Sequence, residues 1–176
     1  MIETQRTSLR PILEEDKYSV FNYRKDSKTN KYQSWVPNTV QEVEKFISNN
    51  PKFNVADSWF QLVIVEKKSN CVIGDVGLHF IDDYQVELGC TLSKDKHGNG
   101  IATEVLKGII DYLFKELDKH RVLASLDPRN HQSIKLMERL KFRKEGHFVK
   151  SILVQGKWED DVIYAILKNE WIKNQA

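Results

Sequence analysis

The sequence predicts an α/β domain whose mixed, mostly antiparallel seven-stranded sheet has helices on both faces. Apolar residues recur at every second position in several segments, which is the period of a β-strand. Two such segments, residues 86 to 92 and 121 to 126, flank a stretch with apolar residues three and four apart, as on one face of a helix. A strand, a helix and a strand in succession imply one parallel pair in the sheet.

The composition is that of an ordinary soluble globular protein. Of the 176 residues, 40% are hydrophobic and 30% are charged, and the length suits a single domain over residues 1 to 176. The net charge of +2 is too small to indicate a nucleic-acid partner. The chain has no leader-like segment and no apolar run near the roughly 18 residues that span a membrane, so we expect a cytoplasmic protein without a membrane partner. Cys71 and Cys90 lie in strand-like runs without metal-ligand spacing, which predicts reduced core residues and no metal.

The first quarter of the chain predicts one strand and two helices. Residues 7 to 12 form the strand, and Pro11 at its end favours an edge position. Three acidic residues at 14 to 16 then favour a helix start, because the helix dipole stabilises negative charge there. The apolar face of this helix is expected to contain Leu13, Val20 and Phe21. Thr39 and Glu42 fit the capping box of a second helix.

The remaining elements follow from alternating apolar runs and turn residues. The strands are expected at residues 59 to 66, 71 to 80, 86 to 92, 121 to 126, 145 to 154 and 158 to 167. Hairpin turns are expected at residues 67 to 70 and 155 to 157, and a short helix near the C-terminus. Two strands next to each other in sequence pair most simply as antiparallel neighbours, which leaves the helical connection after residue 92 to create the parallel pair.

Gly98 and Gly100 lie between the strand at 86 to 92 and the long helix. Because neither residue has a Cβ atom, the backbone can turn tightly and approach a ligand closely. Free N–H groups at the start of a helix form an anion site suited to a phosphate or pyrophosphate. The loop lacks the Gly-Lys-Ser/Thr ending of a nucleoside triphosphatase, and Thr103 stands where a dinucleotide-binding fingerprint requires a third glycine.

Residues 97 to 102 resemble the Gln/Arg-x-x-Gly-x-Gly/Ala motif of the GNAT superfamily of N-acetyltransferases, which binds the pyrophosphate of acetyl-coenzyme A. The first position departs from this motif, because it is His97. Asn130 and Ser133, followed by residues 140 to 142, resemble the family's Asn-x-x-Ser…Leu-Gly-Phe signature, with Lys141 at the glycine that commonly needs a left-handed conformation. The two ends of the chain resemble the RimJ/RimL-type branch, so the resemblance spans essentially the whole chain.

The resemblance implies acetyl-coenzyme A as cosubstrate and a splayed parallel pair that admits its pantetheine arm. In the family, the Asn of the signature holds the pantetheine amide and the Ser lies near the sulfur. The implied coenzyme-binding residues are Cys90, Thr91, Leu92, His97, Gly98, Asn99, Gly100, Ile101, Ala102, Thr103, Asn130 and Ser133. On its own account Asn130 is also a good helix N-cap, and this structural role competes with the functional one.

Glu87 is the best candidate for the catalytic base of an acetyl transfer. A primary amine that attacks a thioester directly, in a ternary complex, must first lose a proton to a general base. The alternation of the strand turns Glu87 away from its apolar neighbours, and its position matches a Glu frequent in the family; a salt bridge within the sheet is the alternative. The resemblance also implies that the Leu92 amide stabilises the oxyanion, a contribution of roughly 3–4 kcal/mol, and that Ser133 polarises the sulfur.

The sequence leaves the amine acceptor open. The nearest resemblance is to enzymes that acetylate the N-terminus of ribosomal proteins, and Trp35 either lines this acceptor site or packs against a helix. A small amine such as a polyamine, an aminoglycoside or an amino acid is the alternative, and a non-catalytic coenzyme A-binding module is another. A polycation would need a carboxylate-lined pocket, for which the candidates are Asp82, Asp83, Glu159, Asp160 and Asp161. The oligomeric state, including a homodimer, also stays open.

Overall fold

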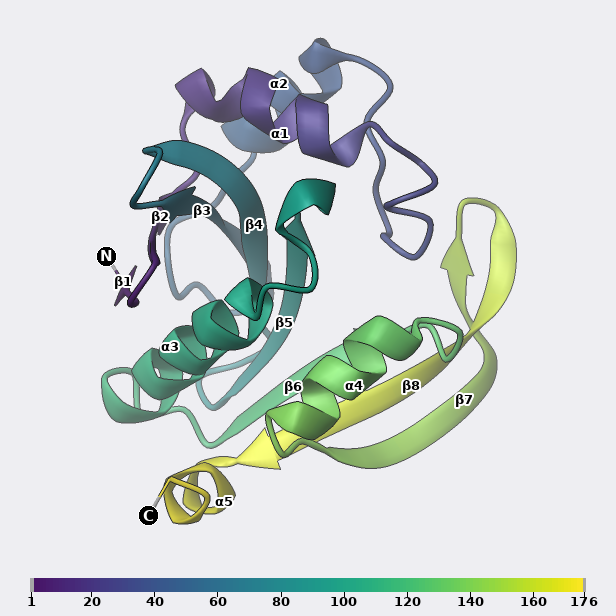
Figure 1. The fold of residues 1–176 in the computed structure, drawn as a ribbon. Coiled ribbons are helices and arrows are strands. Elements are labelled where there is room, and N and C mark those ends of the chain that lie inside the picture. The colour runs from purple at the N-terminus through teal and green to yellow at the C-terminus, as the bar shows by residue number, and fades with distance from the viewer. Residues whose placement is uncertain (1, 176) are drawn as a thin grey trace.

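The computed structural model describes residues 2 to 175, which form an eight-stranded mixed sheet with helices on both faces (Figure 1). The strands are β1 (Ile2–Glu3), β2 (Thr7–Pro11), β3 (Ser58–Glu66), β4 (Cys71–Phe80), β5 (Gln85–Leu92), β6 (Arg121–Leu126), β7 (Arg143–Val154) and β8 (Lys157–Leu167). The helices are α1 (Lys17–Arg24), α2 (Val40–Ser48), α3 (Ile101–Lys115), α4 (His131–Arg139) and α5 (Lys168–Lys173). The strand order is β1-β2-β3-β4-β5-β6-β8-β7. No helix between residues 2 and 175 is long and apolar enough to cross a membrane.

The sheet contains one strand more than the sequence predicts. This strand is β1, which has only two residues and pairs antiparallel with Ser8 and Leu9 of β2. Two residues are too few for an alternating pattern to be visible in the sequence. The predicted edge position of β2 is therefore wrong, because β1 forms the edge of the sheet. Pro11 itself is not paired with β1, which contacts only Ser8 and Leu9.

The predicted parallel pair is confirmed, and it is short. Strands β5 and β6 pair at three positions, the last of which joins Glu87 to Leu123. Beyond this point β5 continues beside β4 as far as Leu92, and β6 continues beside β8 as far as Leu126. The two parallel strands therefore diverge immediately after Glu87, as Figure 1 shows.

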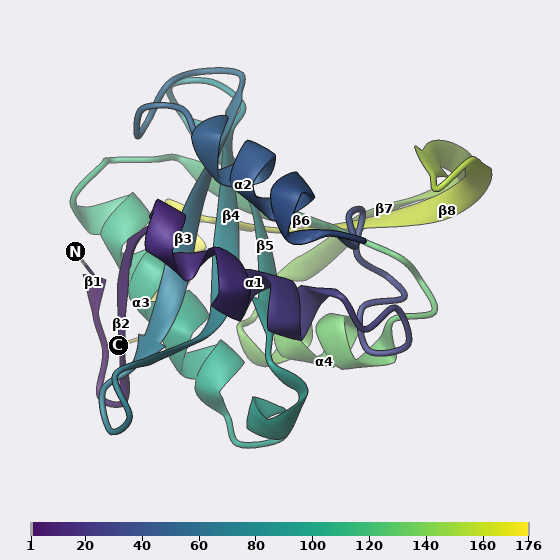
Figure 2. The same ribbon diagram turned by 90° about the horizontal axis from the view of Figure 1, so that it is seen from above.

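The two faces of the sheet bury two separate apolar clusters. Helices α3 and α4 cover one face and α1 and α2 cover the other (Figure 2). The predicted apolar stripe of α3 is confirmed, since Val105, Leu106 and Ile109 are fully buried against the sheet. On the opposite face, Val20 and Val43 pack with residues of β3. Because side chains alternate along a strand, each sheet residue faces one of these two faces of the sheet.

Two predictions about buried residues are wrong. Leu13 is 45% exposed, because the chain enters α1 through a 3₁₀ turn at residues 14 to 16 and the Leu13 side chain stays outside the α1 face. Cys71 is also exposed, because it is the first residue of β4 after the hairpin turn. Cys90 is half-buried on the α3 side of β5, and both thiols are free.

Strands β7 and β8 form a long hairpin whose tip projects beyond the rest of the sheet (Figure 1). The register of the pair shifts twice, once near Gly146 and once between Phe148 and Ile152. Several large apolar side chains of this hairpin are exposed: Phe148, Val149, Leu153 and Trp158. Residues near the tip also line a cavity of about 660 Å³, so the hairpin forms one wall of the candidate site.

Candidate active site

The bend before α3 exposes a set of main-chain donors. Gly98 and Gly100 have φ angles of 76° and 75°, a left-handed conformation that glycine adopts without strain. Within residues 2 to 175, the N–H groups of residues 98 to 103 donate no hydrogen bond to another protein group. Arg6 contacts the outside of the bend, where its Nη1 donates a hydrogen bond to the Asn99 carbonyl oxygen at 2.9 Å. Free N–H groups at a helix N-terminus fit a diphosphate, as the sequence predicts.

The side chain of His97 closes this bend onto the end of β5. Its Nε2 atom lies 2.9 Å from the main-chain oxygen of Leu92. This contact joins the strand to the start of the bend. The imidazole at this position of the motif therefore has a structural partner within the chain.

A small cleft of about 90 Å³ occupies the gap between the diverging strands. Its lining includes Leu88, Gly89 and Cys90 of β5, the end of β6, and Asn130 and Ser133 at the start of α4. Asn130 also caps α4, because its side-chain oxygen accepts a hydrogen bond from the Ser133 N–H at 3.2 Å. The capping role considered for Asn130 is therefore present together with its place in the cleft.

The main chain of β5 presents alternate residues to this cleft. Ser93 donates to the Ile73 carbonyl oxygen at 2.8 Å, so the main-chain groups of Ser93 face β4. Because antiparallel pairing alternates, the N–H groups of Leu92 and Cys90 point the other way, toward the splay. The main-chain groups of Thr91 face β4, so its backbone does not reach the cleft. Its side chain lines a larger cavity on the other face of the sheet.

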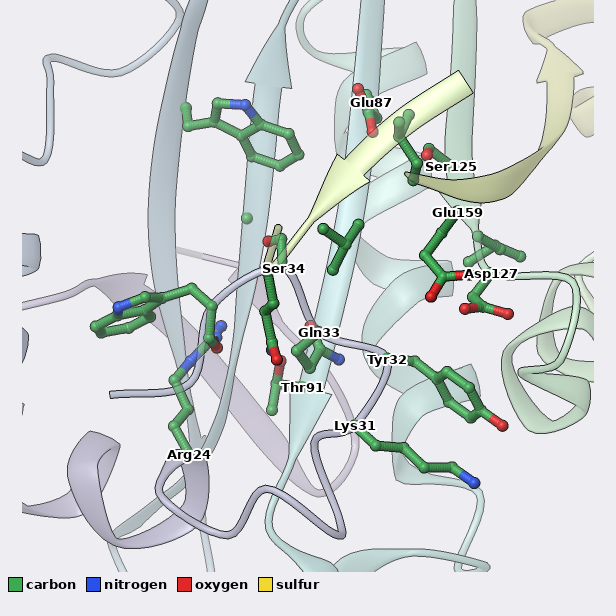
Figure 3. Close-up of a pocket in the computed structure, with 18 of the residues that line it drawn as sticks. Arg24, Lys31, Tyr32, Gln33, Ser34, Glu87, Thr91, Ser125, Asp127 and Glu159 are labelled. Atoms are coloured by element: carbon green, nitrogen blue, oxygen red, sulfur yellow. Dashed lines mark hydrogen bonds between the residues drawn. The ribbon is translucent and has the colours of Figure 1, made fainter. Parts of the chain in front are cut away.

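A larger cavity, about 660 Å³, lies on the other face of the sheet. Side chains from β5, β6, β8 and the segment between α1 and α2 gather around it (Figure 3). Gly89 and Ser125 are among the residues that line both this cavity and the cleft. The two spaces are therefore neighbours at the point where the parallel strands part.

Three rows of residues cross β3, β4 and β5 under the large cavity, and all of their members except His79 and Val63 line it. The strand register aligns Trp59, His79 and Glu87 in the first row, Gln61, Gly77 and Gly89 in the second, and Val63, Asp75 and Thr91 in the third. The second row has two glycines, so it is a groove between two rows of side chains. This groove is not among the features predicted from the sequence, although a glycine inside a strand often marks a close approach by a ligand.

Glu87 faces the large cavity at the point of divergence, on the side of β5 that the alternation predicts. Burial raises the pKa of its carboxyl group, and the neighbouring His79 acts in the opposite direction. The Nδ1 atom of His79 lies 3.4 Å from Glu87 Oε2, and its Nε2 atom lies 3.6 Å from Asp57 at the surface. A half-buried carboxylate with this contact can accept a proton from a ligand in the cavity.

A buried ion pair supports the third row. Asp75 is 1% exposed and accepts hydrogen bonds from Arg24 Nε at 2.8 Å and from the Tyr23 hydroxyl at 2.7 Å. Trp35 lies over the Arg24 guanidinium and stacks on Phe46 of α2 with ring centroids 4.4 Å apart. The packing of Trp35 against a helix is therefore confirmed, and because Trp35 also lines the cavity, its contact with an acceptor stays a prediction. The sequence signal for this ion pair is Asp75 itself, a charged residue inside an otherwise apolar strand.

The five acidic residues considered for a polycation pocket do not converge on the large cavity. Of the five acidic candidates, Glu159 alone lines the large cavity, and Arg129 lies 3.1 Å from it. Asp160 pairs with His147, and Asp161 accepts a hydrogen bond from Ser125. Asp82 accepts hydrogen bonds from nearby backbone N–H groups outside the site.

Comparisons with known proteins agree with this geometry. The protein-family model described as an acetyltransferase (GNAT) domain matches residues 6–143. The uncharacterized N-acetyltransferase YnaD of Bacillus subtilis is 29% identical over 171 residues, which cover 97% of this chain and 98% of the relative. The [ribosomal protein uS5]-alanine N-acetyltransferase of Escherichia coli is 33% identical over 84 residues, 48% of this chain and 43% of that protein.

The same fold is present in a solved structure. The crystal structure of an acetyltransferase (GNAT family) from Bacillus anthracis superposes with a TM-score of 0.86 at 27% identity. The match covers 96% of this chain and 99% of that one. The glycine bend, the diverging parallel strands and the two joined cavities therefore occur in a chain that belongs to the GNAT family of acetyltransferases.

Proposed function

We propose that this enzyme transfers the acetyl group of acetyl-coenzyme A to the N-terminal amine of a peptide, by direct attack in a ternary complex. The main support is the position of Glu87, which lies where the cleft between β5 and β6 opens into the large cavity. One space then holds the acetyl donor and the other holds the amine. A general base at their junction is within reach of the nitrogen that must lose a proton.

The free N–H groups of residues 98 to 103 hold the diphosphate of the coenzyme in this proposal. Cys90, Asn130 and Ser133 line the path of its pantetheine arm. When bound, the coenzyme supplies an acetyl thioester at the junction of the two cavities. The Leu92 N–H points toward the splay, which supports its proposed role as a donor to the developing oxyanion. Ser133 is the proposed donor to the sulfur.

The state of Cys90 supports direct transfer. This thiol lines the cleft, where it could be considered as a nucleophile toward a bound thioester. Burial raises its pKa to about 12, with a smaller contribution in the same direction from Asp75. A thiol must ionise to attack, so the raised pKa of Cys90 favours direct attack by the amine over an acetyl-cysteine intermediate.

The charges around the large cavity favour a peptide amine over a polyamine. Asp75 is paired with Arg24, and both Asp127 and Glu159 are paired with Arg129. The lining as a whole has four positive side chains, Arg24, Lys31, Arg129 and Lys157, and four negative ones, Asp75, Glu87, Asp127 and Glu159. It therefore has no net negative charge to attract a polycation, whereas a peptide brings one amine and a neutral backbone. The Escherichia coli relative named for an alanine of a ribosomal protein adds support.

Detection of free coenzyme A with a panel of amines tests this function. We expect thiol release with a tripeptide that begins with alanine, and none with its N-acetylated form, which is the matched control. Turnover of spermidine but not of the tripeptide would instead favour the small-amine alternative. Binding of acetyl-coenzyme A without turnover of any amine would favour a non-catalytic module.

A further inference from the structure

Gln61 has a side chain that the protein itself leaves unsatisfied. It lies in the middle of β3, lines the large cavity and is only 9% exposed. Its Oε1 atom is buried and has no hydrogen-bond partner among residues 2 to 175. The backbone N–H of Gln61 is by contrast satisfied by Asn50, at 2.8 Å. A buried polar atom without a partner destabilises a folded protein, so a native chain that keeps one calls for an explanation such as a ligand.

The strand register places this side chain at one end of the glycine groove. A Cβ atom at Gly77 would lie 2.9 Å from Gln61 Nε2 and 3.1 Å from a ring carbon of Trp59, so the absence of a side chain there is what admits the carboxamide. Gly89 is the next residue of the same row, and nothing lies within 4 Å of its Cβ position. The groove therefore runs from Gln61 across β4 to the junction of the two cavities.

We infer that the Gln61 carboxamide, which lies over Gly77, is a specificity-determining group that hydrogen-bonds the second or third peptide unit of an acceptor lying in the groove over Gly89. This inference rests on the proposed function. A carboxamide has an acceptor oxygen and two N–H donors, the complement of the C=O and N–H of a peptide unit. It carries no charge, so it offers nothing particular to a polycation.

The length of the groove agrees with this assignment. Neighbouring strands lie about 4.8 Å apart, and residues on one face of a strand repeat every ~6.8 Å, so the carboxamide over Gly77 lies roughly 8 Å from Glu87 on the diagonal. An extended peptide advances about 3.3 Å per residue. With its terminal nitrogen beside Glu87, a peptide reaches the carboxamide about two to three residues later.

The replacement Gln61→Leu tests the inference, because leucine has a similar size and no polar atoms. We expect KM for an alanine-initiated tripeptide to rise roughly three- to tenfold, as for the loss of one hydrogen bond. The values of kcat and of KM for acetyl-coenzyme A should change little. KM for alaninamide, which is too short to reach the groove end, should also stay the same. The melting temperature should not fall, because the variant removes an unsatisfied buried atom.

Gln41→Leu, on the exposed side of α2, is the matched control and should alter none of these values. An unchanged KM for the tripeptide in Gln61→Leu would overturn the inference while leaving the proposed function intact. An equal rise for alaninamide and the tripeptide would overturn it as well, because it would indicate general damage to the cavity. No turnover of the tripeptide by the unmodified enzyme would overturn both.

Discussion

The Nδ1 atom of His79 lies 3.4 Å from the Oε2 atom of Glu87, its register partner on the neighbouring strand. Burial and the charge of Asp161 raise the pKa of Glu87, and the contact with His79 lowers it. The balance matters because a general base has to be deprotonated before it can take a proton from the amine. His79 is thus a positioning residue in this account, and its other nitrogen faces Asp57 at the surface.

His79→Asn should move the acidic limb of the pH–rate profile to higher pH. The carboxylate of Glu87 is the active form, so activity rises as the pH passes upward through its pKa. Without His79, burial and Asp161 act unopposed, and the pKa of Glu87 rises further. The measurement is kcat against pH, with His147→Asn on β7 as the control that should not shift. Coincident acidic limbs for His79→Asn and the unmodified enzyme would remove His79 from the mechanism.

Gly98→Ala should weaken acetyl-coenzyme A binding by about tenfold, since a left-handed conformation costs an alanine roughly 1–2 kcal/mol and the bend would relax. Gly156 offers a close control, because its φ angle is 77° and its Cβ position is equally open. Gly156→Ala should lose similar stability in a urea titration and bind the coenzyme normally in calorimetry. Normal coenzyme binding by Gly98→Ala would argue against the main-chain anion site.

Asp75→Asn should lower the free energy of unfolding by about 3–5 kcal/mol, because it leaves the buried Arg24 guanidinium without its counter-charge. The side chain keeps its shape, so no cavity contributes. Urea denaturation measures the loss. Glu3→Ala, which breaks an exposed pair with Lys67, should change stability far less. Similar losses in the two variants would mean that the buried pair has no special role in holding α1 to the sheet.

The sequence was sufficient to predict elements with strong periodicity. The alternation around Glu87 and the apolar stripe of α3 appear in the fold as expected, because each pattern extends over several turns or pairs. The conformation expected at Lys141 is also present, with a φ angle of 65°. Strand β1 was not predictable, because two residues show no period and its position depends on pairing with a strand that is itself short.

The large cavity was harder to predict than the glycine bend. The glycine bend is one continuous segment, so its chemistry can be recognised in the sequence. The floor of the cavity instead depends on the register of three strands, which brings Gln61, Gly77 and Gly89 into one row. Each residue of the row had a local signal, a polar residue or a glycine within an apolar strand, but only the pairing joins these signals.

The most direct test of the account is the effect of Glu87→Gln on turnover and on coenzyme affinity, measured on the same preparation. The substitution preserves the size of the side chain and removes its ability to accept the proton. We expect kcat to fall by roughly 10²–10⁴-fold while the Kd for acetyl-coenzyme A in calorimetry stays unchanged. An unchanged kcat, or a fall in kcat matched by an equal loss of coenzyme affinity, would contradict the role of Glu87 as the base at the junction of the two cavities.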